Sequence, residues 1–539
     1  MIFTSPYPRA EIPSIDFYTF VTSATYDDSK GILLDHFTQE TRSLRQVKDG
    51  SKRIARGLRE KHDFGKGSIM ALVSDNHIDY GSIALGAIAA GGACMTVNSE
   101  YNAEEMAHQL SNSKAEIIVT TESLVETVKK AIIIAGTVAK SIYVLDNVDS
   151  PNYLWTALAS KSAEMNWTLD AEEYAECPAI LIYSSGTTGK PKGVQLTHRN
   201  LVAHLAQYGV LVQDYGDILT KGTVLNTSPM CYISGVFMII LALLGGETFI
   251  ILPQKYTFDF LLSLVDKYRI GSLAVPPNAI NLLSKSPLTD KYDLSCLKQG
   301  HFFGGPMSRD VCNIVQDKFD MTVGSLYGMT ECCGGICIRV TDYIPADSVG
   351  CVMPNFEIKI IDEDGKPLGV GERGEICARG PSIMKGYFNN PDATHDAFDV
   401  DGFYHTGDIG YMDDRHALYI VDRIKEIIKY DNNQVAPAEL EEHLLLHPAV
   451  SEAAVIGYPS EKEQTELPCG CVVLKDMHDP HPDLAGQIAD HVNDKVVDYK
   501  KLRAGVVFVD HIPRNSHGKI LRRILRTQLQ ETHPLAAIL

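Results

Sequence analysis

The chain has 539 residues and a mass of 59.3 kDa, which is too long for one hydrophobic core and predicts roughly two to four domains or subdomains. Hydrophobic residues make up 45% and charged residues 22% of the sequence, which excludes a largely disordered chain, a collagen-like fibre and a membrane transporter. The 49 basic and 68 acidic side chains give a formal charge of −19, and a net-acidic surface argues against general nucleic-acid binding.

The 12 cysteines are scattered along the chain, and neither the crowded group at 332–337 nor the C-x-C at 469–471 has the paired spacing of a zinc site. We therefore expect reduced, mostly buried thiols in an intracellular protein. The N-terminal segment carries two early prolines and no apolar core stretch, which argues against a secretory signal.

Two long apolar stretches, Gly81–Met95 and Gly235–Gly246, are interrupted by glycine and are too short for a clean membrane span. We predict a buried helix at each. The last three residues, Ala537, Ile538 and Leu539, resemble a peroxisomal tripeptide but lack its basic middle residue. The expected location is therefore the cytoplasm, with the peroxisome as the alternative.

Helical and strand patterns alternate through the first part of the chain. Apolar residues recur at helical spacing over 45–61, and a buried strand follows at 67–75. Strand-like runs begin at 115 and at 140 and flank a helical run over 123–136. This β–α–β order predicts an α/β fold with parallel sheets covered by helices.

The pattern changes after about residue 340. Residues 355–380 alternate apolar and polar positions and contain D-G, G-V-G and R-G turn signals, which predicts a compact β-rich subdomain. From 424 onward the pattern is mixed, with a helix expected over 437–448, another over 486–496 and strands between and after them. The likeliest domain boundary lies in the charged segment after the strand that ends near 423.

The strongest chemical signal is the run LIYSSGTTGKPKGV at 181–194. Glycines let a backbone approach an anion closely, hydroxyls add donors and lysines add charge, so the run predicts a polyphosphate-binding loop. It differs from a Walker A loop because only two residues separate Gly186 from Gly189. The residues expected at the phosphates are Ser184, Ser185, Gly186, Thr187, Thr188, Gly189, Lys190 and Lys192.

This string resembles the phosphate-loop signature of the adenylate-forming (AMP-binding) superfamily, which includes acyl-CoA synthetases, 4-coumarate:CoA ligases, beetle luciferases and peptide-synthetase adenylation domains. The resemblance is strongest to the 4-coumarate ligase and luciferase branch and, within it, to fungal acyl-CoA ligases of secondary-metabolite clusters. Four further motifs follow in the order of that family: YGMTE at 327–331, YHTGD at 404–408, DRIKE at 422–426 and NSHGKI at 515–520.

The resemblance implies a role for each motif residue. Tyr327 is expected to stack on adenine, Thr330 to donate to the α-phosphate, and Glu331 to hold Mg²⁺, a hard cation that prefers carboxylate oxygen. Asp408 should accept the ribose hydroxyls, and Arg423 should place a fixed cation near the ribose and phosphate. The glycines expected beside the nucleotide are Gly304, Gly305 and Gly328.

The implied reaction has two halves: a carboxylate attacks the ATP α-phosphate to give acyl-AMP and pyrophosphate, and the CoA thiol then expels AMP. Lys519 is expected to stabilise charge in the first half and Lys429 to act in the second, with Lys425 as the hinge. The family pattern thus predicts an N-terminal adenylation domain over 1–423 and a small, mobile α+β domain over 424–539. We also expect the basic C-terminal stretch to steer ATP and CoA phosphates.

Three positions depart from the family pattern. Tyr232 stands where a histidine usually lines the acyl and adenylate pocket, to which Ser234 and Gly328 are also assigned. Phe303 replaces a glycine on the acyl side, which predicts a shorter or differently angled pocket. Asn432 replaces a glycine beside the expected pantetheine tunnel and would narrow it.

The leading interpretation is an ATP-dependent acyl-CoA ligase that uses ATP, Mg²⁺, CoA and a small carboxylic acid. The alternatives are an acyl-AMP ligase that loads a carrier protein, a non-catalytic acyl or nucleotide binder, and a luciferase-type oxygenase. Apolar residues near 230–240 and 301–307 predict an apolar acid pocket, which fits an aryl, medium-chain or polyketide-like acid equally well.

Overall fold

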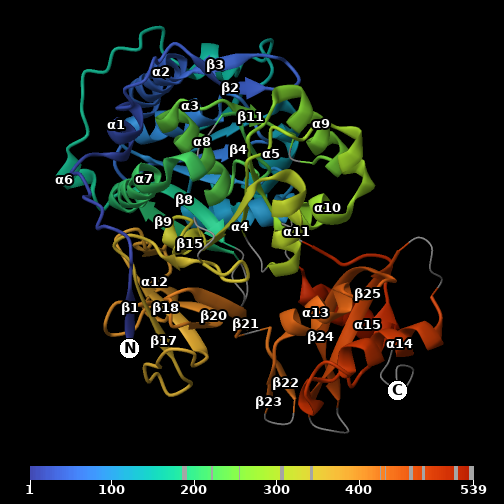
Figure 1. Ribbon diagram of the computed structural model, residues 1–539. Coiled ribbons are helices and arrows are strands. Elements are labelled where there is room, and N and C mark those ends of the chain that lie inside the picture. Colours follow the sequence, from blue (N-terminus) through green and yellow to red (C-terminus); the bar gives the residue numbers. More distant parts are fainter. Residues whose placement is uncertain are drawn as a thin grey trace.

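The computed structural model spans the whole chain, and two layered α/β sheets, an antiparallel subdomain and a separate C-terminal unit are its main parts (Figure 1). It describes residues 1–184, 191–219, 222–253, 255–303, 307, 309–339, 344–424, 426–430, 433–460, 465–475, 480–514 and 520–532. Within these ranges, no helix has the length and hydropathy needed to span a bilayer.

The first large sheet has seven strands in the order β19-β9-β8-β5-β4-β6-β7. The five strands β8, β5, β4, β6 and β7 are parallel. Strands β9 and β19 extend the sheet beyond β8 in antiparallel pairs. The strands are β4 (Ile69–Val73), β5 (Ala93–Val97), β6 (Ile117–Thr120), β7 (Ser141–Val144), β8 (Pro178–Ser184), β9 (Lys192–Thr197) and β19 (Gly386–Tyr387). The accompanying helices are α4 (Ala103–Ser113), α5 (Val125–Ala135) and α6 (Ala171–Tyr174).

The second large sheet has nine strands in the order β16-β15-β14-β13-β12-β10-β11-β2-β3, and its six central strands are parallel. The strands are β2 (Gly31–Asp35), β3 (Thr41–Ser43), β10 (Val224–Asn226), β11 (Phe249–Ile251), β12 (Ser272–Val275), β13 (Gln299–Phe303), β14 (Thr322–Tyr327), β15 (Cys337–Arg339) and β16 (Cys351–Val352). Its helices are α9 (Phe258–Tyr268), α10 (Pro277–Lys285) and α11 (Arg309–Phe319).

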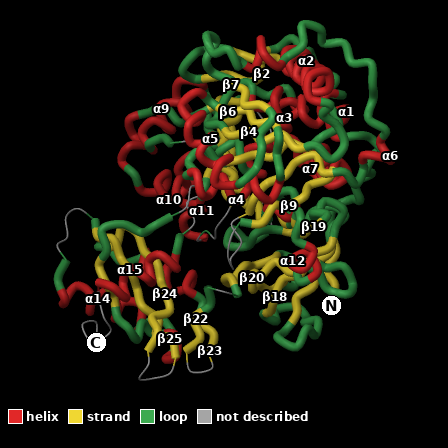
Figure 2. The backbone as a smooth tube through the Cα atoms, turned by 180° about the vertical axis from the view of Figure 1, so that it is seen from behind, coloured by secondary structure: helices red, strands yellow, loops and turns green. Residues whose placement is uncertain are grey.

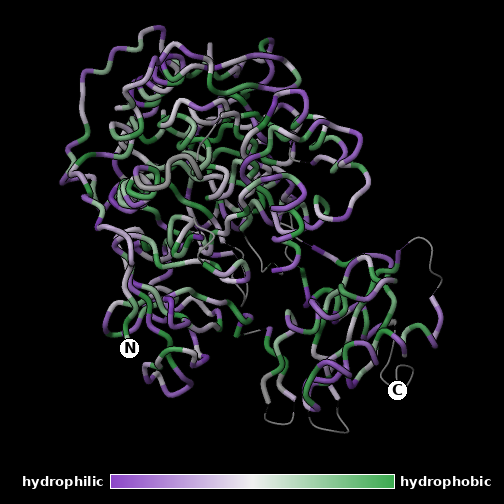
Figure 3. The backbone as a smooth tube through the Cα atoms, in the orientation of Figure 1, coloured by the Kyte–Doolittle hydropathy of each residue, from purple (hydrophilic) through white to green (hydrophobic). Residues whose placement is uncertain are grey.

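The remaining helices of the body are α1 (Phe17–Thr22), α2 (Leu44–His62), α3 (Tyr80–Ala89), α7 (His198–Leu219) and α8 (Ile233–Gly245). Every residue of α3 is buried, and one core joins side chains of both large sheets with those of α3 and α8. These two helices therefore lie inside the body. The hydropathy colouring shows hydrophobic residues concentrated in the interior of the body and hydrophilic residues along the outer loops (Figure 3).

Local sequence signals define α2 well. The Ser43 hydroxyl accepts from the Gln46 amide at 3.2 Å, and the Gln46 side chain accepts from the Ser43 amide at 2.8 Å, which forms a capping box. The helix ends at His62, and its C-cap residue Asp63 has a left-handed φ of 52°, which stops further helical bonding. The predicted helix over 45–61 is confirmed.

One predicted element is wrong in its second half. The apolar stretch Gly81–Met95 was expected to be one helix, but α3 ends at Ala89 and Ala93–Val97 forms β5. Gly91 has a φ of 93°, and Gly91 and Gly92 form the turn between them. The second stretch, Gly235–Gly246, lies mostly in α8, as predicted.

The β-rich subdomain is a five-stranded antiparallel sheet in the order β1-β17-β18-β20-β21. The strands are β1 (Ile2–Thr4), β17 (Glu357–Ile361), β18 (Gly374–Arg379), β20 (Tyr404–Met412) and β21 (Leu418–Arg423), with the short helix α12 (Pro391–His395) beside them. The N-terminal strand thus completes a sheet whose other strands come from residues 357–423.

After Arg423 the chain forms its own small unit, which stands to one side of the body in both views (Figures 1 and 2). It contains a hairpin of β22 (Ile428–Tyr430) and β23 (Asn433–Val435) and a sheet of β24 (Val450–Ser460), β25 (Thr465–Leu474) and β26 (Val506–Phe508). Its helices are α13 (Pro437–Leu445), α14 (Pro482–Asn493) and α15 (Arg522–Thr532).

All 12 cysteines are free thiols, and ten of them are buried. Cys177 and Cys296 are half-buried. The sequence-based expectation of reduced, mostly buried thiols is confirmed, and the folded chain relies on packing and not on disulfide cross-links.

Candidate active site

The candidate site lies where three sheets meet. β8 of the first large sheet ends at Ser184, β14 of the second ends at Tyr327, and β20 of the antiparallel subdomain carries Asp408. Hydrogen bonds connect these ends directly, from Ser184 to Glu331 and from Tyr327 to Asp408. Because ligands of open α/β sheets bind at the carboxyl ends of parallel strands, this junction is where a nucleotide is expected.

Glu331 is at the centre of the first contact group. It lies in a short 3₁₀ helix, η4 (Thr330–Cys332), and its side chain is buried. Oε1 accepts from the Ser184 hydroxyl at 2.9 Å and from the Tyr387 hydroxyl at 3.1 Å. Among the described residues no hydrogen bond reaches Oε2, so one carboxylate oxygen stays free for a further ligand.

Two tyrosines support Glu331. The Tyr387 and Tyr404 hydroxyls lie 3.4 Å apart, and burial, reinforced by the Glu331 charge, raises the pKa of both phenols. Both therefore remain protonated at neutral pH, and Tyr387 acts as a hydrogen-bond donor to the carboxylate. The pair fixes the orientation of Glu331 without adding charge to the site.

Lys192 is close to the same group. Its ammonium lies 4.8 Å from the centre of the Tyr387 ring, because β19 pairs antiparallel with β9 and brings Tyr387 opposite Val194. The cation therefore faces an aromatic ring near a buried carboxylate. Lys192 is among the residues predicted to bind the nucleotide, whereas Tyr387 is not. No sequence pattern around Tyr387 indicates a site residue.

Asp408 is at the centre of the second contact group. Its Oδ2 accepts from the Tyr327 hydroxyl at 2.7 Å, and its Oδ1 forms an ion pair with Nε of Arg423 at 3.2 Å. Asp408 and Tyr327 are both buried, and burial together with the Asp408 charge raises the pKa of Tyr327. Because Asp408 and Arg423 are direct partners across β20 and β21, strand register brings these two predicted residues together.

Gly328 is required by the backbone fold of this region. A Cβ at Gly328 would lie 1.6 Å from the carbonyl oxygen of Gly334, which no side chain can tolerate. The chain after η4 turns back tightly, with Cys333 at a φ of 58° and Gly334 at 122°. Half-buried Thr330 begins η4 inside this turn, beside Glu331.

The residues assigned to the acyl side come from α8 and β13. Tyr232 is the N-cap residue of α8, and its hydroxyl accepts from the side-chain Nδ2 of Asn98 at 2.9 Å, which links α8 to the end of β5. Ser234 is half-buried in the first turn of the same helix. Phe303 ends β13, is half-buried and pairs with Leu326, next to Tyr327.

A buried histidine that sequence analysis missed packs behind the Gly334–Gly335 turn. The His204 ring on α7 is 4.6 Å from that of Phe237 on α8, and burial lowers the pKa of His204 to about 3. The imidazole is therefore neutral at physiological pH. Nothing in the sequence around His204 distinguishes it from an ordinary helix residue.

Several predicted site residues lie outside the described residues, and their roles remain predictions. For Lys429 the backbone of β22 is described but the side chain is not. The C-terminal tripeptide Ala537-Ile538-Leu539 and Asn432 also lie outside the described ranges. The others are Ser185, Gly186, Thr187, Thr188, Gly189, Lys190, Gly304, Gly305, Lys425 and Lys519.

The basic C-terminal stretch differs from the steering surface that sequence analysis expected. Its charges are taken up by acidic partners inside the C-terminal unit, some of them far away in the sequence. The ion pairs are Lys500–Glu439, Lys501–Asp498, Arg503–Asp498, Arg514–Glu452, Arg522–Glu426, Arg522–Glu441 and Arg526–Glu466. Six cations of the stretch are thus paired within the C-terminal unit, whereas Arg523 is exposed.

Asp422 connects the body to the C-terminal unit. It is buried near the end of β21, and its Oδ2 accepts from the Ala438 amide in the first turn of α13 at 3.1 Å. Its Oδ1 accepts from the Arg423 amide at 2.7 Å. Burial raises the pKa of Asp422 from an ordinary 3.8 to about 6, and the Arg522 charge only partly offsets this.

The fold and this junction define an adenylate-forming enzyme: β8 ends at Ser184 before a glycine- and hydroxyl-rich sequence, the Glu331 carboxylate accepts from Ser184, and the Asp408 carboxylate is paired with a tyrosine and an arginine. The sequence matches the description "AMP-binding enzyme" over residues 22–388 and "AMP-binding enzyme C-terminal domain" over 439–519. The chain belongs to the AMP-binding enzyme family.

Relatives align with nearly the whole chain. A probable 4-coumarate–CoA ligase 2 of Dictyostelium discoideum is 34% identical, with 97% of each chain covered. A 4-coumarate–CoA ligase of Pinus taeda is 32% identical over the same shares. The crystal structure of ATP-bound MatB from Rhodopseudomonas palustris superposes with a TM-score of 0.85 at 25% identity, covering 96% of this chain and 99% of that one.

Proposed function

We propose that this protein is an ATP-dependent acid–CoA ligase. It activates a carboxylic acid as acyl-AMP with release of pyrophosphate, and it then transfers the acyl group to the CoA thiol. The observation that carries the proposal is the junction at which Tyr327, Glu331, Asp408 and Arg423 meet, in a chain of the AMP-binding enzyme family.

In this function the second contact group holds the nucleoside. The ionised Asp408 carboxylate accepts the ribose hydroxyls, and Arg423 keeps that carboxylate charged and oriented. Tyr327 orients the other oxygen of Asp408 through its hydroxyl and presents its ring to the base. We assign the phosphates to Thr330 and to the glycine- and hydroxyl-rich run that follows Ser184 in the sequence.

The first contact group fits a hard divalent cation. Glu331 offers its second carboxylate oxygen, and the neighbouring donors Ser184 and Tyr387 fix the first without neutralising it. Mg²⁺ is bound in such sites by one or two carboxylates together with substrate phosphates, where it screens their negative charge. We therefore assign Glu331 as the protein ligand of Mg²⁺ bound with ATP.

The C-terminal unit supplies a different lysine to each half-reaction. We assign residues 1–423 to the adenylation domain and 424–539 to a mobile domain with Lys425 as hinge. In one orientation Lys519 stabilises charge on the attacking carboxylate and α-phosphate, and in the other Lys429 faces the site. The Asp422–Ala438 hydrogen bond at 3.1 Å lies at this boundary and joins the last strand of the body to α13.

We infer that the substrate acid is apolar at the end opposite its carboxylate. Phe303 and the start of α8 contribute mainly ring and aliphatic surface, and two relatives that align over 97% of the chain are named as ligases of 4-coumarate. A panel should therefore contain arylpropenoic, benzoic and medium-chain acids.

The test is pyrophosphate release across this acid panel, with and without CoA, followed by mass detection of the thioester. We expect acid-dependent pyrophosphate release and a CoA thioester of the preferred acid. Pyrophosphate release without any thioester would instead favour loading of a carrier protein, and absence of acid-dependent turnover across the panel would favour a binder without catalysis.

A further inference from the structure

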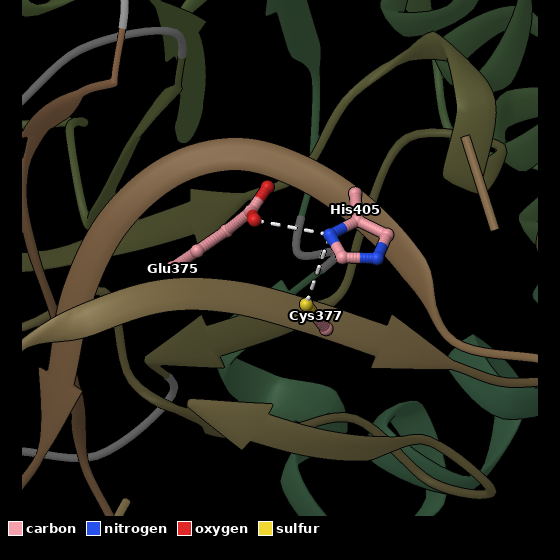
Figure 4. A group of neighbouring side chains, drawn as sticks. All are labelled: Glu375, Cys377 and His405. Atoms are coloured by element: carbon pink, nitrogen blue, oxygen red, sulfur yellow. Dashed lines mark hydrogen bonds and ion pairs between the residues drawn. The ribbon is translucent and has the colours of Figure 1, made fainter. Parts of the chain in front are cut away.

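Three side chains with metal-binding atoms meet on the antiparallel sheet, away from Glu331. Glu375 and Cys377 lie on β18 and His405 lies on β20 (Figure 4). Nδ1 of His405 is 3.0 Å from Oε2 of Glu375 and 3.6 Å from Sγ of Cys377. One donor atom from each residue lies within 4.8 Å of the other two, so a single ion can contact all three.

Strand register explains why these residues share one face. Glu375 and Cys377 are two positions apart on β18, and side chains at that spacing project to the same side of a strand. His405 is the direct partner of Cys377 across the sheet. The register shifts between Glu375 and Cys377, because Glu375 pairs with Ile409, and the irregular segment of β20 between the two pairs contains Thr406, Gly407 and Asp408.

The donor set suits a borderline-soft divalent cation. A thiolate, an imidazole and a carboxylate are ligand types of Zn²⁺, whereas Mg²⁺ prefers oxygen alone. For bonds of about 2.0–2.3 Å, tetrahedral ligands lie roughly 3.3–3.8 Å apart, and the Cys377–His405 distance of 3.6 Å falls in that range. The shorter Glu375–His405 contact is a hydrogen bond that must open by a few tenths of an ångström.

The surroundings favour a cation at this place. The basic side chains on the adjoining parts of β17 and β18 are paired with other carboxylates: Lys359 pairs with Asp399 and Asp401, and Arg379 pairs with Glu357. Among the described residues, the ion pair of the Glu375 carboxylate is with His405. Carboxylates outnumber basic groups around the cluster, which attracts a positive ion.

Solvent can reach the cluster from one side. The Cys377 thiol is fully buried beside Phe403, whereas the His405 and Glu375 side chains keep 29% and 20% of their exposure. An ion can enter between the exposed residues and meet the thiol at the base of the site. The open side leaves a fourth position for water.

We propose that Glu375, Cys377 and His405 bind one divalent transition-metal ion of the Zn²⁺ class. This site is separate from the Mg²⁺ assigned to Glu331 and does not depend on the ligase activity. Metal binding displaces the proton of the Cys377 thiol to the solvent and the proton shared in the His405–Glu375 hydrogen bond, so the ion bonds to thiolate sulfur, imidazole nitrogen and carboxylate oxygen.

An ion here would also stabilise the segment that carries Asp408. Oε1 of Glu375 accepts from the Gly407 amide at 3.2 Å, and the Thr406 hydroxyl donates to the Ile376 carbonyl at 2.7 Å. Holding Glu375 and His405 on one ion would therefore restrain both ends of the segment 405–407. Loading should raise the thermal midpoint of unfolding of the full-length protein.

The experiment is a titration of metal-free, full-length protein with Co²⁺, without ATP because ATP chelates metals. We expect one equivalent of Co²⁺ to produce a thiolate-to-cobalt charge-transfer band, and Zn²⁺ but not Mg²⁺ to displace it. Cys377→Ser should abolish the band, and Glu375→Gln should weaken Co²⁺ binding by at least about tenfold. Cys177→Ser, which removes a half-buried thiol elsewhere, should leave the band unchanged.

A second variant keeps the proposal testable if Cys377→Ser does not fold. His405→Gln retains a hydrogen-bonding partner for Glu375 but removes the imidazole ligand, so loss of the band in this folded variant supports the site. The proposal is overturned if wild-type protein gives no band, or if the band persists in a folded Cys377→Ser or His405→Gln variant. The three residues would then form only a hydrogen-bonded group that stabilises the sheet.

Discussion

Nε of Arg423 lies 3.2 Å from Oδ1 of Asp408 in an ion pair, and the two residues are direct partners on neighbouring strands β20 and β21. The other oxygen of Asp408 accepts from Tyr327, which belongs to the second large sheet. One buried carboxylate therefore connects the antiparallel subdomain to the α/β body. Arg423 is also the last residue of β21, so movement of the chain beyond it acts directly on the residue that orients Asp408.

Replacing Asp408 with asparagine should weaken ATP binding strongly while preserving the fold. The change keeps the shape of the side chain but removes the charge that pairs with Arg423 and that we assign to the ribose hydroxyls. Hydrogen bonds to charged groups contribute about 1.5–3 kcal/mol, so KM for ATP should rise about ten- to a hundredfold. Steady-state kinetics with varied ATP checks this, with exposed Asp364→Asn in the same subdomain as control. An unchanged KM for ATP would contradict the assignment of Asp408 to the nucleotide.

The motif residues at this junction could be predicted because each motif has an unusual residue order at an unusual spacing. Strand alternation and turn signals likewise predicted the β-rich subdomain. The end of α3 could not be predicted: alanine, glycine and isoleucine fill 81–95 without a period that distinguishes helix from buried strand.

Contacts that depend on tertiary folding were beyond sequence reasoning. Tyr387 belongs to a strand of two residues and reaches Glu331 only because β19 pairs with β9. The pairing of the basic C-terminal stretch could not be read from the sequence because several acidic partners are distant, as for Lys500 and Glu439, which are 61 positions apart. Spacing along the chain carries no information about such pairs.

Gly328→Ala should disrupt the site because the added methyl group would overlap the Gly334 carbonyl oxygen. Relief of this overlap requires movement of the backbone between Gly328 and Gly334, which carries Thr330 and Glu331. Overpacking of this kind costs about 1–3 kcal/mol, so the midpoint of denaturation and the adenylation rate should both fall. Gly209→Ala in α7 is the control, since a methyl group there meets no neighbour and should be neutral or slightly stabilising. Equal behaviour of the two variants would show that the tight turn is not required.

Phe303→Gly should broaden the range of accepted acids toward longer or bulkier chains. The ring ends β13 beside the strand pair that leads to Tyr327, and its removal opens space on the acyl side. The order of kcat/KM across the acid panel is the measurement, while KM for ATP should change little. Phe302→Leu is the matched control, because Phe302 points to the opposite face of β13 and is buried in a separate core. An unchanged order of acids in Phe303→Gly would contradict the assignment.

Lys519→Ala should abolish formation of acyl-AMP yet spare thioester formation from supplied acyl-AMP. Its charge is assigned to the first half-reaction only, when the attacking carboxylate and the α-phosphate carry negative charge. Lys429→Ala should show the reverse preference. Pyrophosphate release measures the first half, and mass detection of thioester from synthetic acyl-AMP measures the second. Arg523→Ala, which removes one exposed charge from the same stretch, should leave both halves intact. Equal loss of both halves in Lys519→Ala would argue against two working orientations.

Asp422 should make the stability of the protein fall as pH rises from about 4 to above 6. Its pKa is raised from 3.8 to about 6 in the folded chain, so the folded state holds a proton there that the unfolded state has already released. Under that condition the free energy of unfolding decreases with pH, by about 3 kcal/mol once the group is fully ionised. The ionised, buried carboxylate is thus a cost at neutral pH, at the link between β21 and α13.

Asp422→Asn removes this titration. The amide oxygen can still accept one backbone hydrogen bond, so a loss of about 1 kcal/mol that does not vary with pH is expected from the second. The difference in denaturation midpoint between variant and wild type should therefore shift in favour of the variant as pH rises from about 4.5 to about 7.5. Exposed Asp510→Asn should show no such shift. If the wild type instead gained stability relative to the variant over this range, attraction between Asp422 and Arg522 would outweigh the cost of burial.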